Sequence, residues 1–147
     1  MIQVYLAGPI NGTFYTKETD WRSQATAELK FQSNVSINVL SPMRGKDEFD
    51  GKLIDEVTNH DPIELVGRDY SDIRRSDIIL CNIPKNDKDK ISIGTCAELG
   101  IAYERRIPVV LVCDWWFKDH PFVKVFCQYK VSNLQDGITK IFDVLGL

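Results

Sequence analysis

Hydrophobic positions along this chain fall into short apolar runs that alternate with segments of helical periodicity. Residues 4–6, 77–83 and 108–113 form such runs, and the last two are apolar at almost every position. Strands that are apolar on both faces are typical of a parallel sheet that helices cover on both sides. Residues 35–40 alternate in polarity and predict another strand, and residues 122–133 have room for a short fifth one.

Helical periodicity is found between these runs. The first helical segment carries Trp21, Ala25 and Leu29 on one side, and the second begins with Asp61 as a cap and Pro62 in its first position. Helices are predicted over residues 18–31, 62–75, 95–105 and 134–145. This alternation predicts an α/β fold with one domain over residues 1–147. We expect a doubly wound, flavodoxin- or Rossmann-like parallel sheet of about five strands with helices on both faces.

Composition and charge restrict the function classes. The chain has 147 residues, of which 44% are hydrophobic and 27% charged, and its net charge is −3. A negative chain lacks the basic surface that nucleic-acid binding requires, and no apolar run approaches the roughly 20 residues of a membrane span. The first residues are strand-like and differ from a secretory leader. We therefore expect a cytoplasmic protein with no nucleic-acid and no membrane partner.

The cysteines and histidines give no metal or disulfide pattern. The four cysteines form no CxxC pair and no finger-like spacing with the two histidines. Cys81 and Cys113 lie in apolar runs, where a small buried thiol is the usual finding. We expect reduced, structural cysteines, no metal site and no cofactor.

Ligands in sheets of this kind bind at the carboxyl ends of the strands. The loop over residues 8–12 matches neither a P-loop nor a dinucleotide fingerprint, but Gly8 and Asn11 are candidate binding residues because backbone N–H groups there can line a pocket. At the same edge, Ser92 and Gly94 offer hydroxyl and amide donors to a phosphate or hydroxyl group.

Three further polar residues lie in loops at this edge. Arg44 and Lys46 can help to hold an anion, although the charged segment 44–48 is expected to be exposed. His120 precedes Pro121 and is either an ordinary loop residue or a substrate-binding residue near the site.

Glu98 is the leading candidate for chemistry, and it also fits a purely structural role. It lies in the first turn of the predicted helix, where Thr95 and Glu98 fit the capping-box spacing. A helix N-terminus also favours an ionised carboxylate, and such a carboxylate can attack an electrophilic carbon. The two roles compete for the same oxygens, so a nucleophilic Glu98 should point into the cleft and away from Thr95.

Asp69 is the second candidate because it interrupts an apolar stripe of the helix predicted over residues 62–75, between Leu65 and Ile73. Burying a carboxylate without a partner costs several kcal/mol. Either a neighbouring arginine of this helix pairs with it, or the stripe ends at a cleft. In a cleft, apolar shielding raises a carboxyl pKa and suits it to proton donation.

Three other residues bear on these carboxylates. Asp72 lies one turn after Asp69 and can assist it. Tyr5 is in a position typical of the core, yet its hydroxyl can reach a carboxylate at the ligand edge. Asp77 is expected to contact the end of its own helix.

Taken in order along the chain, these pieces resemble the nucleoside 2-deoxyribosyltransferase-like family, which includes the deoxynucleoside 5′-monophosphate N-glycosidases. The resemblance rests on residues 4–10, 41–46, 68–78, 92–102 and 119–121. It implies that the glutamate matched by Glu98 attacks the anomeric C1′ of a deoxynucleoside, and that water or a second base then takes the sugar. The aspartate matched by Asp69 contacts the departing base and manages its proton, and the tyrosine matched by Tyr5 orients the glutamate.

The resemblance also bears on the substrate and on assembly. Family transferases that act on free nucleosides often have an aspartate six residues before the glutamate, where this chain has Ser92. A hydroxyl tolerates a 5′-phosphate that a carboxylate would repel, so Ser92 shifts the expectation toward nucleotides. Family members form dimers or larger homo-oligomers with a shared active site, and the aromatic residues 115–117 suit either an interface or the core.

Two other hypotheses stay open. The chain can be a catalytically silent nucleotide-binding module that keeps the fold. It can also be a plain α/β interaction domain in which Glu98 only caps a helix.

Overall fold

A five-stranded parallel sheet forms the centre of the molecule in a computed structural model, which describes residues 1–10, 12–54, 60–86 and 88–147. The strand order is β3-β1-β5-β6-β7, and every pairing in this sheet is parallel. The strands are β1 (Ile2–Ala7), β3 (Ile37–Leu40), β5 (Ile78–Asn82), β6 (Val109–Val112) and β7 (Tyr129–Val131). Because the chain moves from β1 to one side and then to the other, the order reverses beside β1, and the doubly wound sheet is confirmed.

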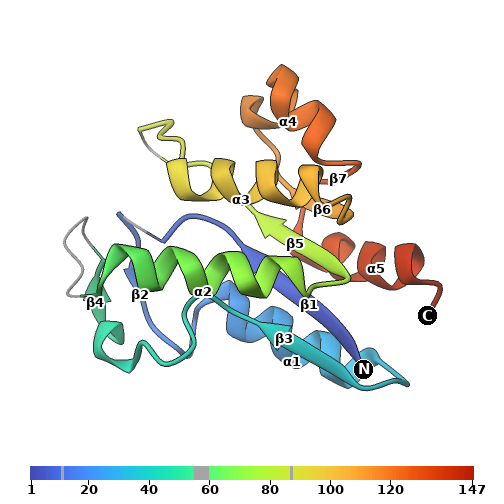
Figure 1. The fold of residues 1–147 in the computed structure, drawn as a ribbon, viewed down its shortest axis with the longest axis horizontal. Helices are drawn as coiled ribbons and strands as arrows, with labels where there is room; N and C mark the ends of the chain where they lie inside the picture. Colours follow the sequence, from blue (N-terminus) through green and yellow to red (C-terminus); the bar gives the residue numbers. More distant parts are fainter. Residues whose placement is uncertain (11, 55–59, 87) are drawn as a thin grey trace.

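Helices cover both faces of the sheet (Figure 1). On one face lie α1 (Trp21–Gln32) and α5 (Leu134–Leu145); on the other lie α2 (Pro62–Arg74), α3 (Ile93–Glu104) and the short α4 (Pro121–Phe126). Alternation along β1 divides the core accordingly. Val4 and Leu6 pack in the cluster with α1 and α5, whereas Tyr5 and Ala7 pack in the cluster with α2 and α3.

Several short elements occur where only loops were expected. Strands β2 (Phe14–Tyr15) and β4 (Lys52–Leu53) pair in an antiparallel ribbon, and 3₁₀ helices form at η1 (Asp47–Phe49) and η2 (Trp116–Asp119). A small cluster of Tyr15, Met43 and Ile54 packs beneath this ribbon. The expected fifth strand is β7, which is only three residues long and follows the unexpected α4.

The cysteines, the lengths of the helices and the aromatic residues 115–117 can be compared with the expectations from the sequence. All four cysteines are free, and Cys81, Cys113 and Cys127 are buried. None of the helices in the described ranges has the length and apolar character that a bilayer crossing needs. In residues 115–117, Trp115 and Phe117 are buried in the core and Trp116 is about half exposed.

Candidate active site

A hydrogen bond between β1 and α3 organises the carboxyl edge of the sheet. The Tyr5 hydroxyl donates to Oε1 of Glu98 at 3.0 Å, and Tyr5 is completely buried. The other oxygen, Oε2, is also buried and has no hydrogen-bond partner among the described residues. One oxygen of Glu98 is thus held in place while the other is available.

The start of α3 differs from the prediction. The helix begins at Ile93, and Ser92 is its N-cap, with its hydroxyl oxygen accepting from the Thr95 N–H at 3.2 Å. The capping box between Thr95 and Glu98 is therefore wrong, and Glu98 lies in the second turn instead of the first. Oε1 of Glu98 accepts its hydrogen bond from Tyr5, so Glu98 does not cap the helix.

There is open space on the face of α3 that carries Glu98. Gly94 lies one turn before Glu98 on the same face, and among the described residues outside its own helix backbone a Cβ there would meet just the Ser92 hydroxyl, at 4.0 Å. A helical side chain leans toward the helix N-terminus, so the Glu98 carboxylate lies over this turn. A bound group can therefore approach the first N–H groups of α3, one turn away from Glu98.

Opposing effects determine the pKa of Glu98. Burial raises the pKa of Glu98 to about 7, against the hydrogen bond from Tyr5, which lowers it. The charge of Asp69 raises this pKa further, and the positive charges of Arg22 and Lys46 lower it. Near neutral pH, Glu98 is thus close to half ionised and can act either as a nucleophile or as an acid.

Asp69 on α2 has the neighbouring arginine that one of the two sequence alternatives required. Its Oδ1 lies 3.6 Å from Nε of Arg68, which makes a long ion pair. The same oxygen is buried and accepts no hydrogen bond from any described residue. Burial raises the pKa of Asp69, and the positive charges of Lys46 and Arg68 lower it. Asp69 is therefore a carboxyl group suited to proton exchange with a bound group.

Asp72 and Arg44 fasten the segment after β3 to α2. Asp72 is 1% exposed and forms ion pairs with Arg44 and, at 2.7 Å, with Arg75. Arg68 donates to the carbonyl oxygens of Pro42 at 2.7 Å and Arg44 at 3.3 Å. Arg44, proposed as an anion contact, thus has an internal partner.

Two cations near Glu98 are buried. Lys46 is 6% exposed, so the prediction of an exposed segment 44–48 is wrong at this residue. Arg22 on α1, which the sequence reading missed, is 4% exposed and donates to the Gly8 carbonyl at 2.9 Å. Its spacing from Ala25 and Leu29 places it on their stripe, and this was the signal that could have identified it.

The other predicted binding residues have varied positions. Gly8 allows the ends of β1 and β5 to approach, because a Cβ there would lie 2.5 Å from the Asn82 carbonyl oxygen. Asn11 lies outside the described residues. His120 is exposed and caps α4 through a 3.3 Å bond from the Phe122 N–H to Nδ1.

Asp77, expected to contact the end of its own helix, accepts a hydrogen bond at 2.8 Å from the Gln3 N–H of β1. Within the described ranges, no group of three or more histidine, cysteine or acidic residues is arranged to hold a metal ion.

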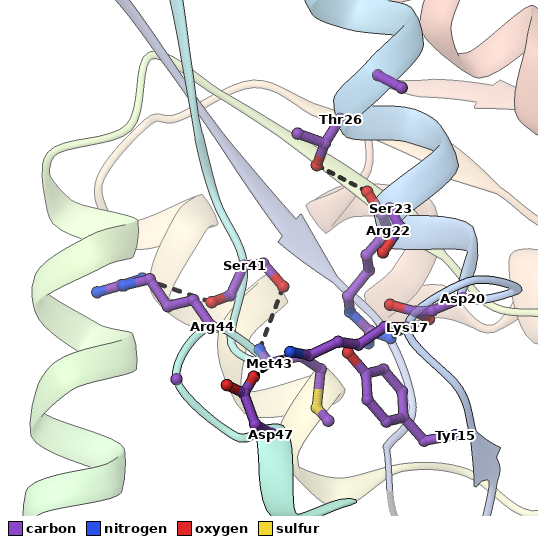
Figure 2. Close-up of a pocket in the computed structure, with 12 residues that line it drawn as sticks. Tyr15, Lys17, Asp20, Arg22, Ser23, Thr26, Ser41, Met43, Arg44 and Asp47 are labelled. Carbon is purple, nitrogen blue, oxygen red and sulfur yellow. Dashed lines mark hydrogen bonds and ion pairs between the residues drawn. The ribbon is translucent and has the colours of Figure 1, made fainter. Parts of the chain in front are cut away.

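A hollow of about 400 Å³ opens between α1 and the segment after β3 (Figure 2). Tyr15, Lys17, Asp20 and Asp47 point toward it, and Arg22 reaches it from α1. Neither Glu98 nor Asp69 lines it. The hollow is therefore a neighbour of the carboxylate cluster and not its cleft.

A comparison with models of protein families shows to which family the chain belongs. The model described as "Nucleoside 2-deoxyribosyltransferase like" matches residues 1–115, a region that holds Tyr5, Asp69 and Glu98. The chain belongs to the nucleoside 2-deoxyribosyltransferase-like family. No curated protein matches this family member.

Solved structures share the fold of this nucleoside 2-deoxyribosyltransferase-like chain at low identity. A conserved protein from Enterococcus faecalis V583 has a TM-score of 0.66 at 18% identity, with 98% of this chain and 99% of that chain covered. A 2-desoxiribosyltransferase from Leishmania mexicana has a TM-score of 0.50 at 15% identity, with 76% of this chain and 64% of that chain covered. A molybdenum cofactor binding protein from Rippkaea orientalis has a TM-score of 0.57 at 12% identity, with 99% and 98% covered. At these identities the similarity establishes the fold alone.

Proposed function

We propose that this protein cleaves or exchanges the N-glycosidic bond of 2′-deoxynucleosides or their 5′-monophosphates through a glycosyl intermediate on Glu98. The observation that carries the proposal is the pairing of Tyr5 with one oxygen of Glu98 while the other oxygen is buried and unpartnered. A purely structural carboxylate gains nothing from such an arrangement, because an unpaired buried oxygen is costly.

The proposed reaction has two displacements. In the first, Oε2 of ionised Glu98 bonds to C1′, the bond from C1′ to the base nitrogen breaks, and its electron pair leaves with the base. Asp69 supplies or shares the proton that the departing base takes up. In the second, water or a nitrogen of another base attacks C1′ and gives its proton to Asp69, while the bond from C1′ to Oε2 breaks and restores the Glu98 carboxylate, as in retaining glycosidases.

Ser92 favours a phosphorylated substrate. Its oxygen accepts from both the N–H and the hydroxyl of Thr95, so its own O–H is left to donate. Beside it, the first N–H groups of α3 lack helical partners, as at any helix start, and attract an anion. We place the 5′-phosphate of the substrate there, with Gly94 leaving it room.

We also propose a homo-oligomer, because apolar side chains are exposed on the face of the molecule formed by α2, α3 and α4. They are Ile63, Val66, Ile93, Tyr103, Phe122 and Val125, all between 48% and 87% exposed. A second copy that covers this face would lie against the first turn of α3, where Ile93 is exposed. Size-exclusion chromatography with light scattering tests this point separately from activity.

A product assay tests the activity. Each deoxynucleoside and each 5′-monophosphate is incubated with the protein, with and without a free acceptor base, and the products are separated by chromatography. Free base with sugar or sugar phosphate indicates a hydrolase, and a new nucleoside or nucleotide indicates a transferase. If no substrate is turned over but a nucleotide binds, the protein is a silent nucleotide-binding module and the proposed activity is wrong.

A further inference from the structure

Lys46 is the one buried lysine in the described part of the chain, and it lies in an otherwise highly charged segment. Gly45 precedes it with a φ of +74°, and the Lys46 N–H donates to the Met43 carbonyl at 3.2 Å. Its carbonyl accepts from the Phe49 N–H at 3.2 Å. The local backbone therefore closes a tight turn from which the lysine side chain is buried instead of extending into solvent.

The position of Lys46 relative to α2 is fixed by its neighbours in sequence. Arg44 pairs with Asp72, and Arg68 binds the carbonyl oxygens of Pro42 and Arg44. These contacts come from both sides of Asp69 on α2. The chain two residues before Lys46 is thus held against the stretch of α2 that carries Asp69, and the Lys46 side chain is buried beside it.

The charged groups that act on Lys46 come from four elements. They are Asp69 and Arg68 on α2, Arg22 on α1, Glu48 on η1 and Glu98 on α3. The positive charge with the largest effect on Asp69 is that of Lys46, and Lys46 also lowers the pKa of Glu98. Burial in turn lowers the pKa of Lys46 itself.

The other cations near the carboxylates have internal partners. Arg22 binds the Gly8 carbonyl and pairs with Asp20 at 3.4 Å, and Arg44 pairs with Asp72. Two carboxylates that share a poorly hydrated site resist ionising together. A glycosyl transfer nevertheless needs Glu98 ionised before it attacks, so a nearby positive charge is required.

We propose that Lys46 is a positioning residue whose positive charge, on a side chain buried beside α2, stabilises the ionised carboxylates of Glu98 and Asp69. The inference rests on the proposed function for its catalytic consequence, but the charge effect exists without turnover. Lys46 acts through the two carboxylates and needs no contact with substrate.

The test separates the effect of the Lys46 charge from the effect of the size of its side chain. Lys46→Met keeps the length of the chain and removes the charge, Lys46→Arg keeps the charge, and Lys30→Met removes an exposed lysine at the far end of α1. The rate of base release at low substrate, kcat/KM, is measured from pH 5 to pH 9. We expect Lys46→Met to move the acidic midpoint upward by about one unit, a loss of about tenfold at pH 6 that largely disappears above pH 8.

Lys46→Arg and Lys30→Met should keep the midpoint of the wild-type protein. A loss in Lys46→Met that is equal at every pH, or an unchanged midpoint, overturns the proposal. Lys46→Gln, which also removes the charge, takes the place of Lys46→Met if that variant does not fold.

A second measurement needs no activity. Carboxyl ¹³C titration by NMR follows Glu98 in wild-type protein and in Lys46→Met, with Glu98→Gln to assign the resonance. An upward shift of the Glu98 midpoint supports the proposal even if no base is released, in which case only the proposed function fails. An unmoved midpoint rejects the role of Lys46 even if the enzyme is active.

Discussion

The Tyr5 hydroxyl and the Glu98 carboxylate form a 3.0 Å hydrogen bond across 93 residues of sequence. It joins the central strand β1 to the second turn of α3, and it binds only one of the two Glu98 oxygens. This contact sets the direction of the carboxylate and lowers its pKa, against the larger effect of burial. Replacing Tyr5 or Glu98 should therefore change both the reactivity of the site and the stability of the protein, and the two effects can be measured separately.

Tyr5→Phe removes the hydrogen bond and keeps the ring. We expect the pKa of Glu98 to rise, because the bond favours its ionised form. kcat/KM for base release should fall by about tenfold or more at pH 6 and recover partly at higher pH. Tyr129→Phe is the control, since Tyr129 is an exposed tyrosine on β7, away from the site. Equal pH profiles for the wild type and Tyr5→Phe would contradict an orienting role.

Glu98→Gln removes the nucleophile but keeps an oxygen that can accept from Tyr5. We expect base release to fall by at least about 10³-fold, because the amide cannot form the glycosyl ester. The measurement is product formation under single-turnover conditions. Release that continues at the rate of the wild type would show that Glu98 is not the nucleophile.

The same substitution changes how stability depends on pH. The pKa of Glu98 is about 7 in the folded protein, above its ordinary value of 4.5. A raised pKa stabilises the folded state below pH 4.5, and this contribution is lost as pH rises through 7. The free energy of unfolding of the wild type should therefore fall relative to Glu98→Gln between pH 5 and pH 8, by roughly 3 kcal/mol at most. Denaturant titrations at the two pH values measure the difference, and parallel curves would show that Glu98 is not buried as a charge.

The sheet was predictable because its strands are fully buried. Residues 77–83 and 108–113 are apolar at almost every position, as expected for strands that helices cover on both faces. The ribbon of β2 and β4 has two residues in each strand, too few for any periodicity to appear.

The site was less predictable because it depends on contacts between distant segments. Ser92 and Thr95 both have capping hydroxyls, and the sequence does not say which one begins the helix. The structure has Ser92 at the cap, and this places Glu98 beneath Tyr5. Lys46 is likewise buried in a segment that Arg68 of α2 binds, and the local sequence, which is highly charged, gives no sign of this burial.

Asp72→Asn tests the contact that holds this segment. The substitution leaves Arg44 and Arg75 without a charged partner at a position that is 1% exposed. Only the Asp72 side of these ion pairs is buried, since the Arg44 and Arg75 side chains are 39% and 54% exposed, so we expect the free energy of unfolding to fall by roughly 1–3 kcal/mol. Asp143→Asn, which breaks the exposed pair with Lys140, should cost less than about 1 kcal/mol. Denaturant unfolding of both variants gives the comparison, and equal losses would mean that Asp72 is an ordinary surface charge.

Ser92 can be changed in charge without losing the helix cap. Asp and Asn both cap helices as well as Ser does, so Ser92→Asp and Ser92→Asn should each keep α3 intact. Only the aspartate repels a 5′-phosphate placed at the start of the helix. We expect the ratio of kcat/KM for a deoxynucleoside 5′-monophosphate to kcat/KM for the free deoxynucleoside to be at least about tenfold lower in Ser92→Asp than in Ser92→Asn, since about 1.4 kcal/mol of repulsion suffices for that factor. Steady-state assays of both substrates with both variants measure it. The same ratio in the two variants would mean that the phosphate does not bind beside Ser92, because their capping is matched and they differ there in charge.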